Sequence, residues 1–395
     1  MEKKVKYDFS TSADRENTNA EKYTLREKLF GTEDVLPVWV ADMDIDTPDF
    51  VIDAVKKRLK HPIFGYEEFP KSAFLAQMNW MQKEHSVSFE LEEMLYSHSV
   101  VASMNVAIEA FSKEGDGVIV QTPVYPPFFQ SVLKHKRELI KNPLKQLKDG
   151  RYIFDIEDLK SKIDEKTKLL LLCSPHNPVG RVWHKEELEE ILEVCATHNI
   201  VVFSDEIHCD LVYSPNKHIP FASLSHEAKE ISVSAIGVGK TFNMAGFAMS
   251  SVAIPNQVLR EKFREVYEKI HFAQGTIFGH VGFESAYTNG KEWLEALKVH
   301  LFINFQMLEN LCKQYPTKIK ITPIEATYLA WLDCRGMNLS DKELRDFFIK
   351  EAKLGLNAGL SFGREGSGFI RLNFALSFGK MSQVLEQLEY ALQKI

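Results

Sequence analysis

The sequence has few cysteines and no long uncharged apolar run, and both shortages exclude classes of protein. Its five cysteines are widely spaced over 395 residues and form no C-x-x-C pair, which argues against a disulfide framework and against a zinc cluster. No apolar stretch approaches the ~18 residues that cross a bilayer, and no apolar segment follows the charged N-terminus. We therefore expect a reduced cytoplasmic protein with no metal site and no membrane partner.

Basic charge is also in short supply. The formal net charge is −7 at pH 7, and basic residues form only short groups such as Lys134–Arg137. A nucleic-acid partner requires an extended basic surface, so we expect none. With 45% hydrophobic residues, the chain can bury a large core and is long enough for more than one structural unit.

From residue 150 onward, apolar strands alternate with an amphipathic helix. The runs 168–173 and 200–204 are continuously apolar or nearly so, and 186–198 between them has apolar residues at i, i+3, i+4 and i+7. Strand, helix and strand in this order predict an α/β protein with a parallel sheet. Towards the C-terminus, the strand patterns at 328–333 and 369–376 predict a smaller α+β unit.

Polar clusters follow the predicted strands at the point where each ends. Ser174–Gly180 and Asp205–His208 follow the two apolar strands, and Lys240 follows an apolar run and two glycines. Because ligands of parallel sheets lie beyond the carboxyl ends of the strands, we expect these clusters to meet. Tyr125, held between prolines after the strand at 118–122, could cover a planar ligand or line the core.

A serine-led helix offers a further ligand site. Met104, Ala107, Ile108 and Phe111 have helical spacing, and Ser97 or Ser99 marks the start of the helix. Its free N–H groups and its dipole form a possible phosphate seat.

These residue types match the needs of pyridoxal phosphate. The cofactor requires an amine for its aldehyde, a carboxylate that keeps its pyridine nitrogen protonated, a donor for its phenolic oxygen, a ring on its face and a phosphate seat. The chain offers one candidate for each, in the same order: Lys240, Asp205, Asn177, Tyr125 and the helix that begins near Ser99. Arg371 lies between apolar residues of a predicted strand, where it either faces solvent or holds an anion such as a substrate carboxylate.

Seven motifs occur in one order along the chain: Trp39–Asp44, Gly65–Tyr66, Thr122–Pro127, Ser174–Gly180, Ser204–His208, Gly239–Gly246 and Ile370–Phe374. Together they resemble the fold-type-I pyridoxal phosphate enzymes, and among these the MalY/PatB subgroup of cystathionine β-lyases and cysteine-sulfur lyases. The resemblance covers essentially the whole chain.

The resemblance implies an aspartate aminotransferase-like α/β fold. A mostly parallel seven-stranded sheet would form a large cofactor domain at 51–285, and a smaller α+β domain at 286–395 would be joined by the N-terminal segment 1–50. It also implies a homodimer, in which Tyr66 reaches the phosphate bound by the partner subunit.

The same resemblance assigns roles at the site. Lys240 would be the Schiff-base lysine, Asp205 the pyridinium partner and Tyr125 the stacking ring, and these three are the predicted catalytic residues. Asn177 would donate to the phenolic oxygen, and Arg371 would anchor the substrate carboxylate. The remaining implied contacts are Ser99, Val100, Val101, His208 and Tyr66 with the cofactor, and Ala41, Asp42 and Asn177 with the substrate.

The chain departs from its relatives around the phosphate. Gly237 and Gly239 stand where relatives usually have a serine or threonine three residues before the lysine and a serine directly before it, and Ser99–Ser103 replaces a Gly-Val-Val-Pro-Ala segment. One phosphate hydroxyl is therefore missing at Gly237, a loss of about 1 to 3 kcal/mol unless Ser99 or Ser103 replaces it.

We expect a β-lyase that acts on cystathionine or related cysteine S-conjugates. Lys240 would take the Cα proton, and Lys240 or Tyr125 would protonate the departing sulfur, giving a thiol, pyruvate and ammonia. Two alternatives stay open: an aminotransferase, which shares every step up to the carbanion, and a regulatory binding protein on the same scaffold. The sequence leaves the preferred thioether open.

Overall fold

A seven-stranded sheet organises the larger part of the computed structural model, which describes residues 7–270 and 275–395. The strands lie in the order β2 (Met94–Ser97), β10 (Ser250–Ala253), β9 (Ser232–Gly237), β8 (Val201–Asp205), β7 (Thr167–Cys173), β3 (Gly117–Val120) and β4 (Glu138–Lys141). Of these, β10 alone runs antiparallel to its neighbours. The predicted α/β class with a mostly parallel seven-stranded sheet is confirmed.

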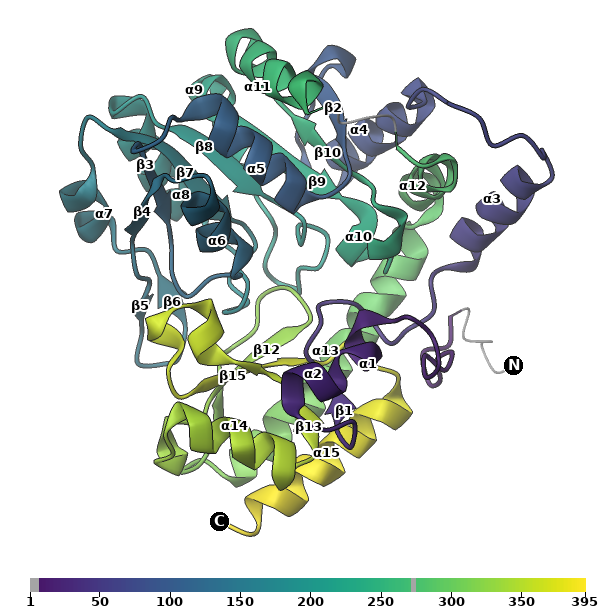
Figure 1. Ribbon diagram of the computed structural model, residues 1–395, viewed down its shortest axis with the longest axis vertical. Helices are drawn as coiled ribbons and strands as arrows, with labels where there is room; N and C mark the ends of the chain where they lie inside the picture. The colour runs from purple at the N-terminus through teal and green to yellow at the C-terminus, as the bar shows by residue number, and fades with distance from the viewer. Residues whose placement is uncertain (1–6, 271–274) are drawn as a thin grey trace.

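Helices cover both faces of this sheet (Figure 1). On one face lie α5 (Val100–Phe111), α6 (Pro127–Lys134) and α11 (Gln257–Lys269). On the other lie α7 (Ile156–Lys162), α8 (Lys185–Thr197) and α9 (His226–Ile231). Because both faces are covered, β3 and β9 are buried at every residue, which explains their apolar and small side chains.

A second, antiparallel sheet lies below the first in Figure 1. Its order is β11 (Lys320–Ile321), β12 (Leu329–Asp333), β15 (Phe369–Asn373) and β14 (Asn357–Ala358). The helices near it are α13 (Lys291–Gln314), α14 (Asp341–Lys350) and α15 (Phe378–Leu392). The N-terminal strand β1 (Leu36–Pro37) pairs with β13 (Leu354–Gly355), so the N-terminal segment joins this smaller unit. The domain boundaries at 50 and 285 stay predictions.

The remaining elements complete the connections. The helices are α1 (Glu21–Thr24), α2 (Arg26–Phe30), α3 (Asp49–Leu59), α4 (Lys71–His85), α10 (Val238–Thr241) and α12 (Ile277–Asn289), and the strands are β5 (Lys145–Gln146) and β6 (Tyr152–Ile153). Short 3-10 turns lie at Leu91–Glu93, Phe221–Ser223, Ala245–Phe247, Arg335–Met337, Gly359–Phe362 and Arg364–Gly366. Within the described residues, none of the helices combines the length and apolar character needed to span a bilayer.

Two local predictions have different outcomes. Ser99 is the N-cap of α5, where its Oγ accepts from the Ala102 N–H at 3.1 Å, so the expected serine cap is confirmed. The residues Asp46, Thr47 and Pro48 also predict a helix start, with Asp46 or Thr47 as the cap and Pro48 as the first helical residue. This prediction is wrong, because α3 begins at Asp49 and Pro48 is its N-cap. The Thr47 hydroxyl instead donates to the Asn243 carbonyl at 3.1 Å, a tertiary contact that local sequence does not reveal.

Candidate active site

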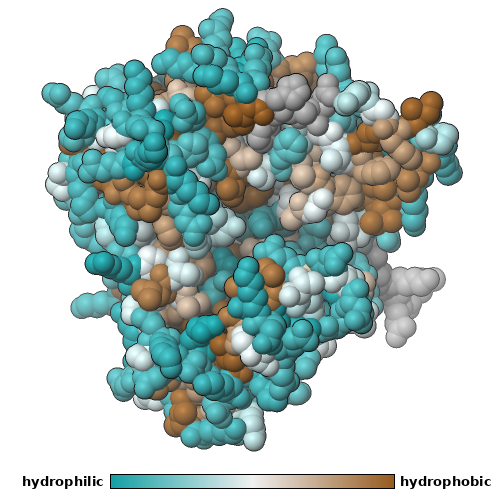
Figure 2. Space-filling view, viewed as in Figure 1, coloured by the Kyte–Doolittle hydropathy of each residue, from teal (hydrophilic) through white to brown (hydrophobic). Residues whose placement is uncertain are grey.

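A cavity of about 220 Å³ lies beyond the carboxyl ends of β7, β8 and β9. The space-filling view shows this face hollowed near its middle, between the upper and lower parts of the molecule (Figure 2). Nine of the residues predicted from the sequence line the cavity: Ala41, Ser99, Val100, Val101, Tyr125, Asn177, Asp205, His208 and Lys240. The parallel topology therefore brings the strand-end clusters together as expected.

Lys240 lies on α10, the single helical turn that directly follows β9. Its Nζ donates to the Ala41 carbonyl at 2.6 Å. The pKa of this amine is lowered to about 8, mainly by burial and also by the nearby Arg371, although Asp42 and Asp205 oppose the shift. A lysine with this pKa can lose its proton near neutral pH, as a nucleophile or a general base must.

Asp205 is the last residue of β8 and is buried beside the cavity. Its Oδ1 accepts from the Ile207 N–H at 3.1 Å. Burial raises the pKa of this carboxyl to about 7, more than the hydrogen bond and the Lys240 amine can offset. A buried carboxylate is favourable only beside a compensating donor or cation, and a protonated pyridine nitrogen is such a partner.

Arg371 does not line the cavity itself, but it is held beside it by two asparagines and by the Trp39 carbonyl. Its guanidinium donates to Asn177 Oδ1 at 3.0 Å and to Asn357 Oδ1 at 2.7 Å. Because Asn177 accepts from Arg371 through its oxygen, its NH₂ group is left to donate elsewhere. Burial lowers the pKa of Arg371 to about 10, and its Nε has no partner among the described residues. A carboxylate bound here would offset the cost of burial.

Tyr125 follows β3 and lies against this pair. Its backbone N–H donates to the Asn177 carbonyl at 3.2 Å, which fixes the turn that carries the ring. Burial raises the pKa of the Tyr125 hydroxyl, so the phenol stays protonated and can donate a proton.

The N-terminus of α5 forms another wall. Ser99, Val100 and Val101 line the cavity, and the first N–H groups of a helix have no acceptor within the helix. Ser103, the second serine considered as a phosphate donor, bonds instead to Ser97 Oγ at 2.7 Å and is absent from the lining.

The donors fit pyridoxal phosphate. Four groups surround one cavity, and each suits one part of the cofactor. The Lys240 amine suits the aldehyde, and the Asp205 carboxyl suits the pyridine nitrogen. The Asn177 amide suits the phenolic oxygen, and the N-terminus of α5 suits the phosphate. The buried Asp205 is the strictest test, because the nearby Lys240 amine and the Ile207 N–H do not offset the burial of its carboxyl group.

Three predicted residues differ from the rest in their charge state or in their position relative to the cavity. His208 lines the cavity with an unpartnered Nδ1 among the described residues, and burial lowers its pKa to about 3, so the ring is neutral. Asp42 directs its carboxylate to Arg15 and not into the cavity. Tyr66 is 99% exposed on the loop between α3 and α4, so any role at the cofactor requires a second subunit.

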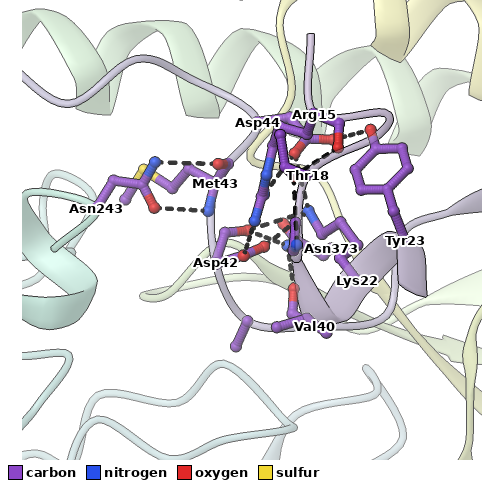
Figure 3. Close-up of polar contacts among 12 residues, drawn as sticks. Arg15, Thr18, Lys22, Tyr23, Val40, Asp42, Met43, Asp44, Asn243 and Asn373 are labelled. Carbon is purple, nitrogen blue, oxygen red and sulfur yellow. Dashed lines mark hydrogen bonds and ion pairs between the residues drawn. The ribbon is translucent and has the colours of Figure 1, made fainter. Parts of the chain in front are cut away.

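An ionic cluster holds the segment Ala41–Asp44 in place (Figure 3). Arg15 donates to Asp42 and Asp44 at 2.7 and 2.8 Å, and the buried Lys22 lies 3.0 and 3.4 Å from their carboxylates. Burial would raise the pKa of Asp44, but Lys22, Lys380 and Arg15 together lower it below its usual value. The segment with the Ala41 carbonyl that meets Lys240 is therefore held by Arg15 and Lys22 of the N-terminal region and by Lys380 of α15.

Sequence reasoning missed Tyr328 and Lys22. The Tyr328 hydroxyl donates to the Ala41 carbonyl at 2.8 Å, the same oxygen that accepts from Lys240. Thr327, directly before it, has φ of +72°, a strained conformation for a β-branched residue. Neither residue carries a local signal, because Tyr328 fits strand alternation and Lys22 resembles any surface lysine.

Comparisons with known proteins agree with this geometry. The profile of the family described as aminotransferase class I and II matches residues 34–388. Cystathionine beta-lyase PatB of Bacillus subtilis (strain 168) is 38% identical over 385 residues, which cover 97% of this chain and 99% of PatB.

Two solved structures align with nearly the whole chain. Cystalysin from Treponema denticola, which contains pyridoxal 5′-phosphate, has a TM-score of 0.95 and 32% identity, covering 98% of this chain and 99% of its own. The PLP-bound C-S lyase from Staphylococcus hominis has a TM-score of 0.90 and 30% identity, with the same coverage of 98% and 99%.

Proposed function

The chain belongs to the aminotransferase class I and II family, and we propose that it is a pyridoxal phosphate-dependent carbon–sulfur β-lyase that cleaves L-cystathionine or related cysteine S-conjugates. One observation carries the proposal: a buried amine with a pKa of about 8 and a buried carboxyl with a pKa of about 7 line one cavity. The names of PatB as a cystathionine beta-lyase and of the Staphylococcus hominis protein as a C-S lyase support the choice of reaction.

The cofactor would be held by side chains at four points. Lys240 would hold its aldehyde carbon, Asp205 its pyridine nitrogen, Asn177 its phenolic oxygen and the N-terminus of α5 its phosphate. Bound in this way, pyridoxal phosphate supplies an electron sink for the pair released when the Cα–H bond of an amino acid breaks. Tyr125 would cover the ring.

The substrate would be oriented by Arg371. Its guanidinium, already fixed by Asn177 and Asn357, would bind the α-carboxylate through paired hydrogen bonds. The Ala41 carbonyl accepts from the Lys240 amine and so directs its lone pair and protons within the cavity. Ala41 and Asp42 lie on the segment that borders the substrate side of Lys240.

Lys240 and Tyr125 would transfer the protons of the reaction. With its lowered pKa, the free amine of Lys240 can accept the Cα proton, and the ammonium formed can donate to the departing sulfur. The protonated Tyr125 phenol is the second possible donor. Overall, L-cystathionine and one water give homocysteine, pyruvate and ammonia.

The proposal extends to assembly and location. Ile63, Phe64 and Tyr66 are exposed on one loop, and we propose that this loop contacts the partner subunit of a homodimer, where Tyr66 would reach the partner's cofactor phosphate. The five cysteines are buried with free thiols, as suits the reducing cytoplasm.

The test combines a spectrum with product analysis. The purified chain with pyridoxal phosphate should show the visible absorption band of a lysine-bound cofactor, and L-cystathionine should give equal amounts of pyruvate and free thiol without any oxo-acid acceptor. Lys240→Ala should lose the band and lower turnover about a thousandfold or more. Lys83→Ala, on the exposed side of α4, is the matched control.

The contrary outcomes separate the alternatives. Amino-group transfer that requires an oxo acid, with no thiol released, would identify an aminotransferase. A bound cofactor with neither product would favour a regulatory binding protein.

A further inference from the structure

The cofactor cavity offers little positive charge to a phosphate. Among the described residues that line it, Lys240, His98 and His208 are basic and none is an arginine, and burial lowers the pKa of His208 to about 3, so its ring is neutral. Burial lowers the pKa of His98, which favours its neutral form. The Lys240 amine would bind the aldehyde of the cofactor and is therefore not available to the phosphate. Most of the phosphate binding must therefore come from neutral N–H and O–H donors near the N-terminus of α5.

Ser250 is one such donor, on the antiparallel strand β10. It lines the cavity and is 2% exposed, and its backbone lies directly opposite Gly237 of β9. Its Oγ donates to the carbonyl of Ser97 at 3.1 Å, two residues before the cap of α5. A hydroxyl can rotate its single O–H, so this group can turn from Ser97 to a phosphate oxygen without moving heavy atoms.

Gly237 provides the space that Ser250 occupies. A Cβ on Gly237 would lie 2.9 Å from Ser250 Cβ and 3.0 Å from Ile207 Cδ1, closer than real side chains pack. The φ of Gly237 is −172°, an extended conformation open to any residue, so space and not backbone geometry requires glycine here. At Gly239, by contrast, a Cβ would meet nothing closer than 3.5 Å.

We infer that Ser250 is a phosphate-binding residue of this chain and that Gly237 is the space it requires. The hydroxyl missing at position 237 is then supplied from the neighbouring strand, and Ser103 is not its replacement. Ser103 is directed to Ser97 and does not line the cavity, whereas Ser99 Oγ accepts from the Ala102 N–H and keeps its own O–H as a second donor. The inference rests on the proposed function, because it concerns the phosphate of the same cofactor.

The test compares pyridoxal phosphate with pyridoxal, which lacks the phosphate. Both are titrated into the cofactor-free protein, and binding is followed by absorbance. Ser250→Ala should weaken pyridoxal phosphate binding about tenfold or more, the effect of one hydrogen bond to a charged group, and should leave pyridoxal binding unchanged. Ser103→Ala, the matched control, should change neither.

Equal weakening for both compounds, or no weakening, would overturn the role of Ser250. If the unaltered protein binds neither compound, the proposed function itself fails. These two failures are therefore distinguishable.

A second pair of variants tests the exchange between strands. Gly237→Ser alone should displace Ser250 and lower both the thermal midpoint and the affinity for pyridoxal phosphate, whereas Gly239→Ser should leave the thermal midpoint nearly unchanged. Adding Ser250→Gly to Gly237→Ser should raise the affinity for pyridoxal phosphate above that of either single variant. In the double variant, the new serine at position 237 has the space that the Ser250 side chain occupied. Additive losses in the double variant would contradict the exchange.

Discussion

Asp205 is a carboxyl group in surroundings that disfavour its charge. Burial raises its pKa to about 7, and among the described residues its carboxylate accepts a hydrogen bond from the Ile207 backbone N–H. Such a residue stabilises a bound cation at the expense of the empty protein. Its cost should therefore be measurable in the cofactor-free chain.

Asp205→Asn should stabilise the cofactor-free chain increasingly as the pH rises. The folded-state pKa lies above the unfolded value of 3.8, so the contribution of Asp205 is fully present below about pH 4 and is lost as the pH passes through about 7. Asparagine does not titrate. Thermal midpoints should therefore be similar near pH 4 and higher for the variant near pH 8. Parallel curves would contradict this, and Asp53→Asn on the exposed side of α3 is the control.

The site residues that local sequence predicted most directly end a strand or open a helix, although Arg371 was predicted inside a strand. Asp205, Asn177 and Lys240 follow apolar strands, and topology then brings them together. Ser250 is placed opposite Gly237 by strand register. Tyr328 reaches the site through a hydrogen bond to Ala41, 287 residues away along the chain. No periodicity or spacing encodes either relation. The individual roles of the site residues stay predictions until variants are measured.

At the scale of elements, the short helix α1 connects the N-terminus to the lysine. It carries Lys22, whose buried amine faces Asp42 and Asp44, and Asp42 directly follows Ala41, whose carbonyl accepts from Lys240. Removing one partner from a buried ionic cluster leaves the opposing charges uncompensated.

Lys22→Met should therefore lower the free energy of unfolding by about 3 to 5 kcal/mol. It should also raise KM for the substrate, because the Ala41 carbonyl loses part of its support. Denaturant unfolding and steady-state kinetics measure the two effects. Lys28→Met, on the exposed side of α2, should change neither. A Lys22 variant as stable as this control would show that Arg15 and Lys380 suffice.

Helices and buried strands were largely predictable, whereas strand direction was not. The apolar spacing of Phe74, Leu75, Met78 and Met81 predicts a helix over 71–85, and α4 has these bounds. The reversal of β10 follows from the short connection after α10, and the apolar run that predicted the strand is the same in either direction. The start of α3 was mispredicted because a tertiary contact took the hydroxyl of Thr47.

At the scale of the molecule, the loop with Ile63, Phe64 and Tyr66 is the strongest candidate for subunit contact. Ile63 is 67% exposed, and exposed apolar side chains clustered on one loop are typical of an interface. We expect the chain to sediment at twice its 45.3 kDa mass.

Ile63→Glu should shift this species towards the monomer, because a charge would be buried at the interface. Pyridoxal phosphate affinity should fall with it if Tyr66 acts across the dimer. Sedimentation velocity and cofactor titration measure the two effects. Leu133→Glu, which is 58% exposed in the native chain and lies on α6, is the matched control and should stay dimeric. A dimeric Ile63 variant would place the interface elsewhere.

The pairing of β2 also limits when the protein can become functional during its synthesis. Within the described sheet, β2 is an edge strand whose neighbour is β10, and their paired residues Ser97 and Ser250 are 153 positions apart. The helix that would receive the phosphate begins just after β2, so it stays unanchored on a growing polypeptide until β10 has left the ribosome. We therefore expect the cofactor to bind late in synthesis. Chains terminated before residue 250 should be unable to retain pyridoxal phosphate.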